Sequence, residues 1–135
     1  MIFPAGTEIA FEIVNALKYS KFVKLYGGTI TEDHSEFVFE NLIKGFPYID
    51  SPNLLNYLNR IIEEYQIDCI YPAHDSVSMF LSEFSEKILA QVIITEYEMT
   101  KICRSKLKTY EYLSDYNFIP KTYKCMNEVE QYPVF

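Results

Sequence analysis

The chain has 135 residues, of which 49 % are apolar and 23 % are charged, a composition ordinary for one globular domain with its own core. A formal net charge of −7 argues against nucleic acid or an acidic membrane surface as a partner, because phosphate groups are bound by clustered Lys and Arg side chains. Residues 1–4 lack the pattern of a signal peptide, and no apolar run approaches the about 20 residues of a membrane span, so we expect a cytoplasmic protein.

Short apolar runs alternate with helical patterns along the chain, which is typical of β-α-β units around a parallel sheet. We predict strands at residues 1–4, 22–26, 67–71 and 91–94, with a further short strand at 46–49 and no assignment for 31–40. We predict helices at residues 9–17, 53–66, 76–89, 96–103 and 105–113, the last capped by Ser105. The predicted fold class is α/β, a Rossmann-like parallel sheet with helices on both faces.

The three cysteines, Cys69, Cys103 and Cys125, are odd in number and form no C-x-x-C pair. A disulfide framework or a zinc site would need paired cysteines at short spacings. We therefore expect three reduced thiols in or near the core.

The first strand ends in a glycine turn, PAGT at residues 4–7, which leads into a helix. In an open parallel sheet, ligands bind beyond the carboxyl ends of the strands, so Gly6 and Thr7 are candidate binding residues. The free N–H groups of the helix are able to receive an anion, but a plain strand-to-helix turn is an equal alternative for Gly6. The turn has one glycine where a dinucleotide fingerprint has three, and the chain contains no phosphate-binding loop and no nucleophile elbow. We assign no catalytic and no metal-binding residue.

His74 and Asp75 follow the predicted strand at 67–71 and place an imidazole and a carboxylate at the same edge of the sheet. Titratable groups there favour a binding role. A helix that begins at Ser76 would also use Asp75 as its cap, and the two roles can coexist. Asp33 and His34 either face the same crevice or belong to a solvated loop.

The segment ICRSKLKTYEYLSDYNFIPKTY, residues 102–123, resembles the join between the first two domains of ATP-grasp enzymes. This superfamily includes biotin carboxylase, the carbamoyl-phosphate synthase large subunit and many carboxylate–amine ligases. Ser105 and Lys106 stand where the family usually has Asp-Lys, and FIPKT at 118–122 looks like the segment that opens the next strand. Upstream, DCIYPAHDSV and IFPAGTEIA are similar to the family's D-x-x-x-P-x-x-D loop and to its opening strand, glycine turn and helix.

The resemblance implies a pre-ATP-grasp domain at residues 1–103, a linking helix at 104–120 and the truncated start of the ATP-grasp domain at 121–135. The ending QYPVF would lie in the strand that delivers the first ATP-binding lysine, so we expect the catalytic half to be missing. Lys106 would contact ATP; the alternative is a solvated helix lysine. ATP and Mg²⁺ would be bound by the full-length enzyme, with the acidic metal ligands beyond Phe135 and no cofactor held tightly by this fragment.

Two functions follow. The first is the substrate-side domain of an ATP-dependent ligase, which activates a carboxylate as an acylphosphate for attack by an amine or a thiol. Gly6, Thr7, His74 and Asp75 would then contact the small-molecule substrate, a carboxylate or an amine. The second is a stand-alone α/β ligand-binding or receiver-like module that uses Asp33 and Asp75. A receiver domain needs paired acids at the end of the first strand, where this chain has none. A homodimer is left open.

Overall fold

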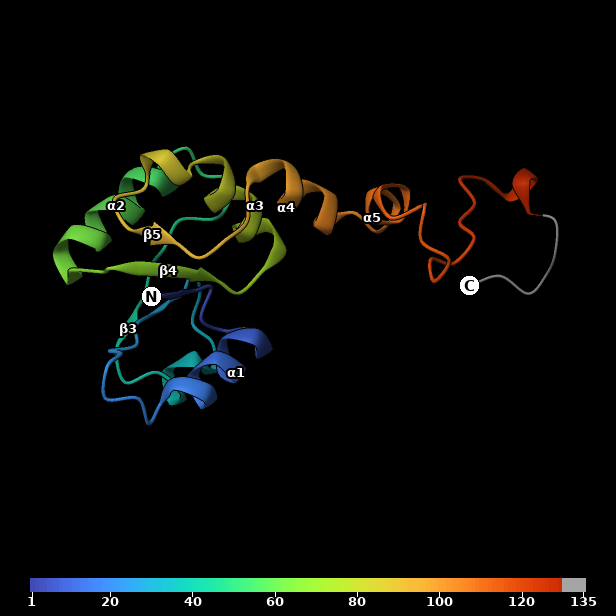
Figure 1. Ribbon diagram of the computed structural model, residues 1–135. Coiled ribbons are helices and arrows are strands. Elements are labelled where there is room, and N and C mark those ends of the chain that lie inside the picture. Colours follow the sequence, from blue (N-terminus) through green and yellow to red (C-terminus); the bar gives the residue numbers. More distant parts are fainter. Residues whose placement is uncertain (130–135) are drawn as a thin grey trace. The chain divides into compact units, whose positions relative to one another are not determined.

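A parallel sheet forms the centre of the computed structural model, which describes residues 1–129 (Figure 1). Within these residues the sheet has five strands, β1 (Ile2–Phe3), β2 (Gly27–Gly28), β3 (Leu42–Ile43), β4 (Cys69–Pro72) and β5 (Gln91–Val92). Their order is β3-β2-β1-β4-β5, and each neighbouring pair is parallel. The predicted α/β class with a parallel sheet is confirmed.

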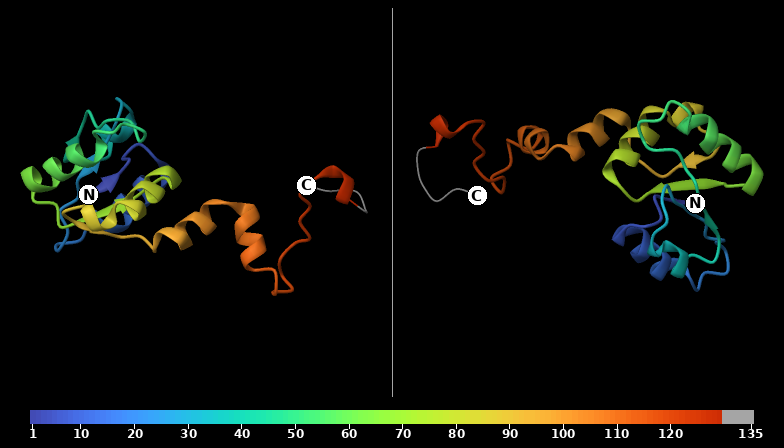
Figure 2. Two further views of the ribbon diagram at one scale, coloured as in Figure 1. Left: turned by 90° about the horizontal axis from the view of Figure 1, so that it is seen from above. Right: turned by 180° about the vertical axis from the view of Figure 1, so that it is seen from behind.

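Helices cover both faces of the sheet, with α1 on one face and α2 and α3 on the other (Figures 1 and 2). The α-helices of the described chain are α1 (Glu8–Leu17), α2 (Leu54–Tyr65), α3 (Asp75–Glu83), α4 (Tyr97–Arg104) and α5 (Lys106–Tyr112). The described chain also contains short 3₁₀ helices, η1 (His34–Phe37), η2 (Ser85–Lys87) and η3 (Met126–Glu128).

The strand order explains why the helices divide between the two faces. From β1 the chain adds β2 and then β3 on one side, and through α2 it then returns past β1 to add β4 and β5 on the other side. Because crossovers between parallel strands are right-handed, reversing the direction of travel moves the helix to the opposite face. The order therefore reverses between β1 and β4, and in such sheets this switch point is where ligands bind.

The larger core lies between the sheet and the helices α2 and α3. Phe3 of β1 and Ile70 of β4 are fully buried there, packed with Leu54, Leu58 and Leu81. Leu54 and Leu58 of α2 are four residues apart, as are Val77 and Leu81 of α3, so each helix turns one apolar side to the sheet. The smaller core lies under α1 and holds Ile2, Ala5, Ala10, Val14, Phe39 and Ala73.

The predicted strands at residues 22–26 and 46–49 are wrong. Phe22 is 98 % exposed, and the second strand is formed by Gly27 and Gly28. Aromatic rings pack directly on both glycines, since a Cβ on Gly27 would lie 2.8 Å from the ring of Phe39 and one on Gly28 would lie 3.0 Å from the ring of Phe46. The third strand is β3 at Leu42–Ile43, which leaves Phe46 free to pack against Phe3 with ring centroids 4.7 Å apart.

Other boundaries differ from the sequence expectation in smaller ways. The helix predicted at 76–89 divides into α3 and η2, and the unassigned segment 31–40 contains η1. The cysteines are free thiols, but only Cys69 is partly buried, whereas Cys103 and Cys125 are exposed. The expectation of a core position is therefore wrong for those two.

The chain forms two compact units, one at Met1–Thr100 and a second from Lys101 onwards. The first unit contains the sheet and both of its cores. No helix among residues 1–129 has the length and apolar character needed to cross a membrane. The strand expected at QYPVF lies outside the described residues.

Candidate functional site

The loops that follow β1, β2 and β4 leave the same edge of the sheet. The backbone N–H of Ala5 donates to the carbonyl oxygen of Gly28 at 2.8 Å, and that of Ala73 donates to the carbonyl oxygen of Phe3 at 2.8 Å. The glycine turn after β1 is thus flanked by the loop after β2 and by the loop after β4. Gly6, Thr7 and His74 accordingly lie in loops that begin at the switch point, and Asp75 is the first residue of the helix that follows one of them.

Thr7 begins α1 as its N-cap. Its Oγ1 accepts a hydrogen bond from the backbone N–H of Ala10 at 3.1 Å, so the side chain is engaged within the helix end. The first N–H groups of a helix have no carbonyl partner within it, which leaves those of Glu8 and Ile9 for other acceptors. Glu8 itself is acidic and exposed in this first turn.

His74, and not Asp75, caps α3. The Nδ1 atom of His74 accepts a hydrogen bond from the backbone N–H of Ser76 at 3.2 Å, and the helix starts at Asp75. The interpretation of Asp75 as the cap is therefore wrong by one residue, because the extended backbone ends at His74. With Nδ1 as the acceptor, Nε2 is the nitrogen able to donate to a ligand. Asp75 is exposed in the first turn of the helix.

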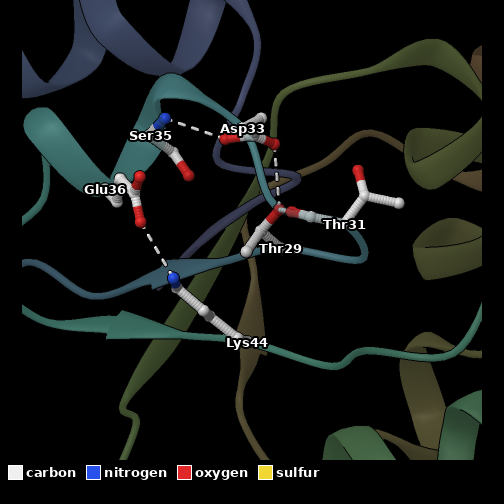
Figure 3. Close-up of polar contacts among 6 residues, drawn as sticks. All are labelled: Thr29, Thr31, Asp33, Ser35, Glu36 and Lys44. Atoms are coloured by element: carbon white, nitrogen blue, oxygen red, sulfur yellow. Dashed lines mark hydrogen bonds and ion pairs between the residues drawn. The ribbon is translucent and has the colours of Figure 1, made fainter.

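Asp33 is the centre of a polar cluster between β2 and η1 (Figure 3). Its Oδ1 accepts a hydrogen bond from the backbone N–H of Ser35 at 2.8 Å, so that Asp33 caps η1. Its Oδ2 lies 3.0 Å from Oγ1 of Thr29, a residue that is 98 % buried by the fold and itself contacts the carbonyl oxygen of Thr31 at 2.7 Å. Hydrogen bonds therefore hold Asp33 in place, although its neighbours Glu32 and His34 are exposed.

The carboxylate of Asp33 also lies against Gly6. A Cβ on Gly6 would be 2.6 Å from Cγ and 2.9 Å from Oδ1 of Asp33, distances at which one of the groups has to move. The glycine is thus required here for close approach and not for an unusual backbone angle. This contact joins the turn after β1 to the loop after β2, a pairing that the sequence alone does not determine.

The surroundings of the Asp33 carboxyl favour its ionised form. Burial alone would raise its pKa, but hydrogen bonds from Ser35 and Thr29, together with the charge of His34, outweigh burial and lower the pKa from its usual 3.8. Lys44 of the same region forms an exposed ion pair with Glu36 at 2.9 Å. The pKa of Lys44 is raised by the same hydrogen bond and charge from Glu36.

Lys106 is the first residue of α5 and is exposed. Ser105 caps this helix as predicted, with its Oγ accepting from the backbone N–H of Lys108 at 3.4 Å. A contact between Lys106 and ATP stays a prediction. Across residues 1–129, no group of three or more His, Cys, Asp or Glu side chains is placed to hold a metal ion, so we assign no Mg²⁺ ligand to this part of the chain.

These observations define an open-sheet α/β protein whose candidate site lies at the switch point of the strand order. No protein-family model matches the sequence, and no curated protein matches it. The function is therefore argued from the residues of the site.

Proposed function

We propose that the chain is the N-terminal, substrate-side domain of an ATP-grasp ligase, an enzyme that activates a carboxylate as an acylphosphate and transfers it to an amine or a thiol. One observation carries the proposal. Of the four residues expected to contact the substrate, Gly6, Thr7 and His74 lie in the loops that leave the adjacent strands β1 and β4 at the switch point, and Asp75 begins the helix after the second loop. A domain that presents a small molecule to a neighbouring ATP-binding domain needs such an edge.

The segment from Lys101 onwards supports the same proposal. It forms the second compact unit, which contains α5 with the resembling FIPKT segment after it. Lys106 lies in the first turn of α5, where a positive charge opposes the helix dipole and the turn has no acidic residue. Helix stability does not explain a lysine there, whereas contact with a phosphate group would, since a fixed cation stabilises the charge of phosphoryl transfer.

A direct test uses the chain of residues 1–135 and Mg-ATP in isothermal titration calorimetry. The proposal expects no tight binding, because the ATP-binding half would lie in another domain. A dissociation constant in the low micromolar range, which corresponds to a binding free energy of about −8 kcal/mol, would contradict the assignment of ATP binding to another domain.

A second test uses the longer protein that the proposal requires. Replacing Lys106 by Ala should lower turnover at least about tenfold, with an unchanged melting temperature. Lys108→Ala, two residues further along the same exposed helix, is the matched control and should retain turnover. Normal turnover of the Lys106→Ala variant would show that Lys106 is a solvated helix lysine that does not contact ATP. A reading frame that stops after Phe135 would overturn the proposal as a whole.

A stand-alone binding module is the second candidate. The observation in its favour is that Gly6, Asp33 and His74 all belong to the first unit, so the edge of the sheet needs no residue from Lys101 onwards. Such a module would bind its ligand with the same affinity whether or not residues 101–135 are present. The ligase proposal expects the ATP-dependent reaction to be lost with them.

A further inference from the structure

The loop between α1 and β2 gathers positive charge on an acidic protein. Residues 18–24, KYSKFVK, hold three of the 12 basic residues of the chain, Lys18, Lys21 and Lys24, and all three are exposed. None of these lysines forms an ion pair with a residue in the range 1–129. Phe22, in the middle of the loop, is 98 % exposed. The loop therefore presents an apolar ring among positive charges.

A groove of about 430 Å³ opens beside this loop, and Phe22 is part of its lining. It lies between the end of α1, at Leu17, and the exposed side chains of Tyr71 and Ile93. Because Ile70 points into the core under α2 and side chains alternate along a strand, Tyr71 points to the opposite, α1 side of the sheet. A cavity of about 150 Å³ already holds a benzene ring, so the groove has room for an aromatic side chain.

Negative charge gathers around a second exposed ring, that of Phe37 at the end of η1. Phe37 is 84 % exposed, and three exposed acids flank it in the chain, Glu32, Glu36 and Glu40. The sequence has no Lys or Arg between positions 25 and 43. η1 lies beside α1, since the ring centroids of His34 and Phe11 are 5.0 Å apart. The acidic ring and the basic groove are therefore both presented on the α1 side of the sheet.

We propose that the α1 side of the sheet is a docking surface for a second copy of this chain. Phe37 of one copy enters the groove of the other, and its flanking acids meet the lysines of the 18–24 loop. Two patches on one face can meet twice about a two-fold axis that runs between them, so each copy supplies both halves of the interface. An aromatic side chain seated in a pocket within a charged rim is a common anchor of protein interfaces.

Charge complementarity favours a second copy as the occupant, because the basic loop and the acidic η1 each find their opposite on the other molecule. The net charge of −7 on each copy opposes association at long range. Salt at about 0.15 M screens exposed charges beyond about 8 Å, so the charges in contact decide the outcome. Asp68, an acid that lines the groove, interacts with the ammonium group of Met1, which partly balances its charge. The surface goes beyond the proposed function and does not rest on it.

The test is sedimentation velocity of the chain of residues 1–135 at concentrations from about 1 to 100 μM and about 0.15 M salt. The expected result is a reversible transition from monomer to dimer. A chain that stays monomeric throughout would overturn the proposal. Growth beyond the dimer would overturn it as well, because patches that meet about a two-fold axis are used up by two copies.

Two apolar variants locate the interface. Phe22→Ser and Phe37→Ser should each weaken the dimer at least about tenfold, because each removes a ring that the interface uses twice. Leu89→Ser is the matched control: Leu89 is 61 % exposed and its backbone bonds Asn59 of α2, on the other side of the sheet. It should leave dimerisation unchanged. A dimer that survives both phenylalanine substitutions, or that is weakened equally by all three, would place the interface elsewhere and reject the proposal.

A charge exchange tests whether the surface is complementary to itself. One variant carries Lys21→Glu and Lys24→Glu, and the other carries Glu32→Lys and Glu40→Lys, which leaves the ion pair of Glu36 with Lys44 intact. Each variant alone should be monomeric because like charges meet, whereas an equimolar mixture should recover the dimer. Both variants keep a negative net charge, so a general attraction does not explain recovery. A mixture that stays monomeric would refute the pairing of the two patches.

The double variant Glu63→Lys with Glu64→Lys is the matched control for charge reversal. These exposed acids lie on α2, on the other side of the sheet, so this variant should dimerise as the wild type does. Vesicles containing phosphatidylserine test the alternative occupant of the basic loop, a lipid surface. Binding of a monomeric wild type to such vesicles, lost in Phe22→Ser, would assign the loop to the membrane and overturn the dimer.

Discussion

The carboxylate of Asp33 rests on the Cα of Gly6, so that a residue after β2 occupies the space that a side chain after β1 would need. This contact is the point at which the two loops of the candidate site depend on each other. It also gives the clearest expectation for mutagenesis.

Gly6→Ala should destabilise the fold by about 1–3 kcal/mol, because the added methyl group displaces Asp33 from its bonds to Ser35 and Thr29. Urea unfolding measures the change. The same substitution made together with Asp33→Ala should cost much less, since the clash is then gone, and this cycle isolates the contact. Equal costs in both backgrounds would show that the methyl group meets something else.

Ser35→Ala should raise the melting temperature. The substitution removes a buried hydroxyl for which residues 1–129 supply no hydrogen-bond partner of good geometry, and relief of about 1 kcal/mol corresponds to about 4 °C for a domain of this size. Differential scanning calorimetry of the ligand-free chain checks it. A lowered melting temperature would mean that the hydroxyl is already bonded in the free protein.

The lowered pKa of Asp33 predicts an acid-sensitive contribution to stability. A carboxyl whose pKa is lower in the folded than in the unfolded protein stabilises the fold above the unfolded value, here 3.8, and loses that contribution as the pH falls through the lower folded value. The free energy of unfolding of the wild type should therefore drop more steeply below pH 4 than that of Asp33→Asn. Parallel curves for the two proteins between pH 5 and pH 2.5 would contradict the assignment.

His74 should contribute as a helix cap whatever else it binds. His74→Ala should cost about 1 kcal/mol, because the N–H of Ser76 loses its acceptor, whereas His74→Asp supplies another capping oxygen and should keep the stability. Chemical denaturation of both variants separates this role from ligand binding. If Ala and Asp are equally tolerated, the bond at 3.2 Å contributes nothing measurable.

The parts of the fold that were predictable from sequence are those with a strong local pattern. The strand before His74 and the helix α2 carry long apolar signals, and both were expected within a few residues of their observed bounds. The strand β2 was misplaced because Phe22 and its neighbours resemble a strand, whereas glycine is a poor strand former. Glycine is needed at position 27 because the ring of Phe39 packs against it. Phe39 is twelve residues away in the chain, so a local sequence pattern does not reveal this contact.

The candidate site shows the same limit. Gly6 and His74 could be named from their positions after predicted strands, since strand order and loop position follow from the α/β pattern. The role of Asp33 could not, because it depends on Thr29 and Ser35 within a loop that carries no periodic signal. The only local signal was a glycine in the turn after the first strand and an acidic residue shortly after the second. The structure shows that these two residues approach each other closely.

The two glycines of β2 have a consequence for how this sequence can vary. In the core under α1, a Cβ on Gly27 would meet the ring of Phe39 at 2.8 Å and the Cβ of Ala5 at 3.0 Å; in the core under α2, one on Gly28 would meet the rings of Phe46 and Phe3 at 3.0 and 3.1 Å. Alanine at position 27 therefore requires a smaller residue at 39, and alanine at position 28 requires a change at 46 or 3. Across divergent descendants of this chain, substitutions at 27 and 39 should appear together, as should those at 28 with 46 or 3, as two independently coevolving groups.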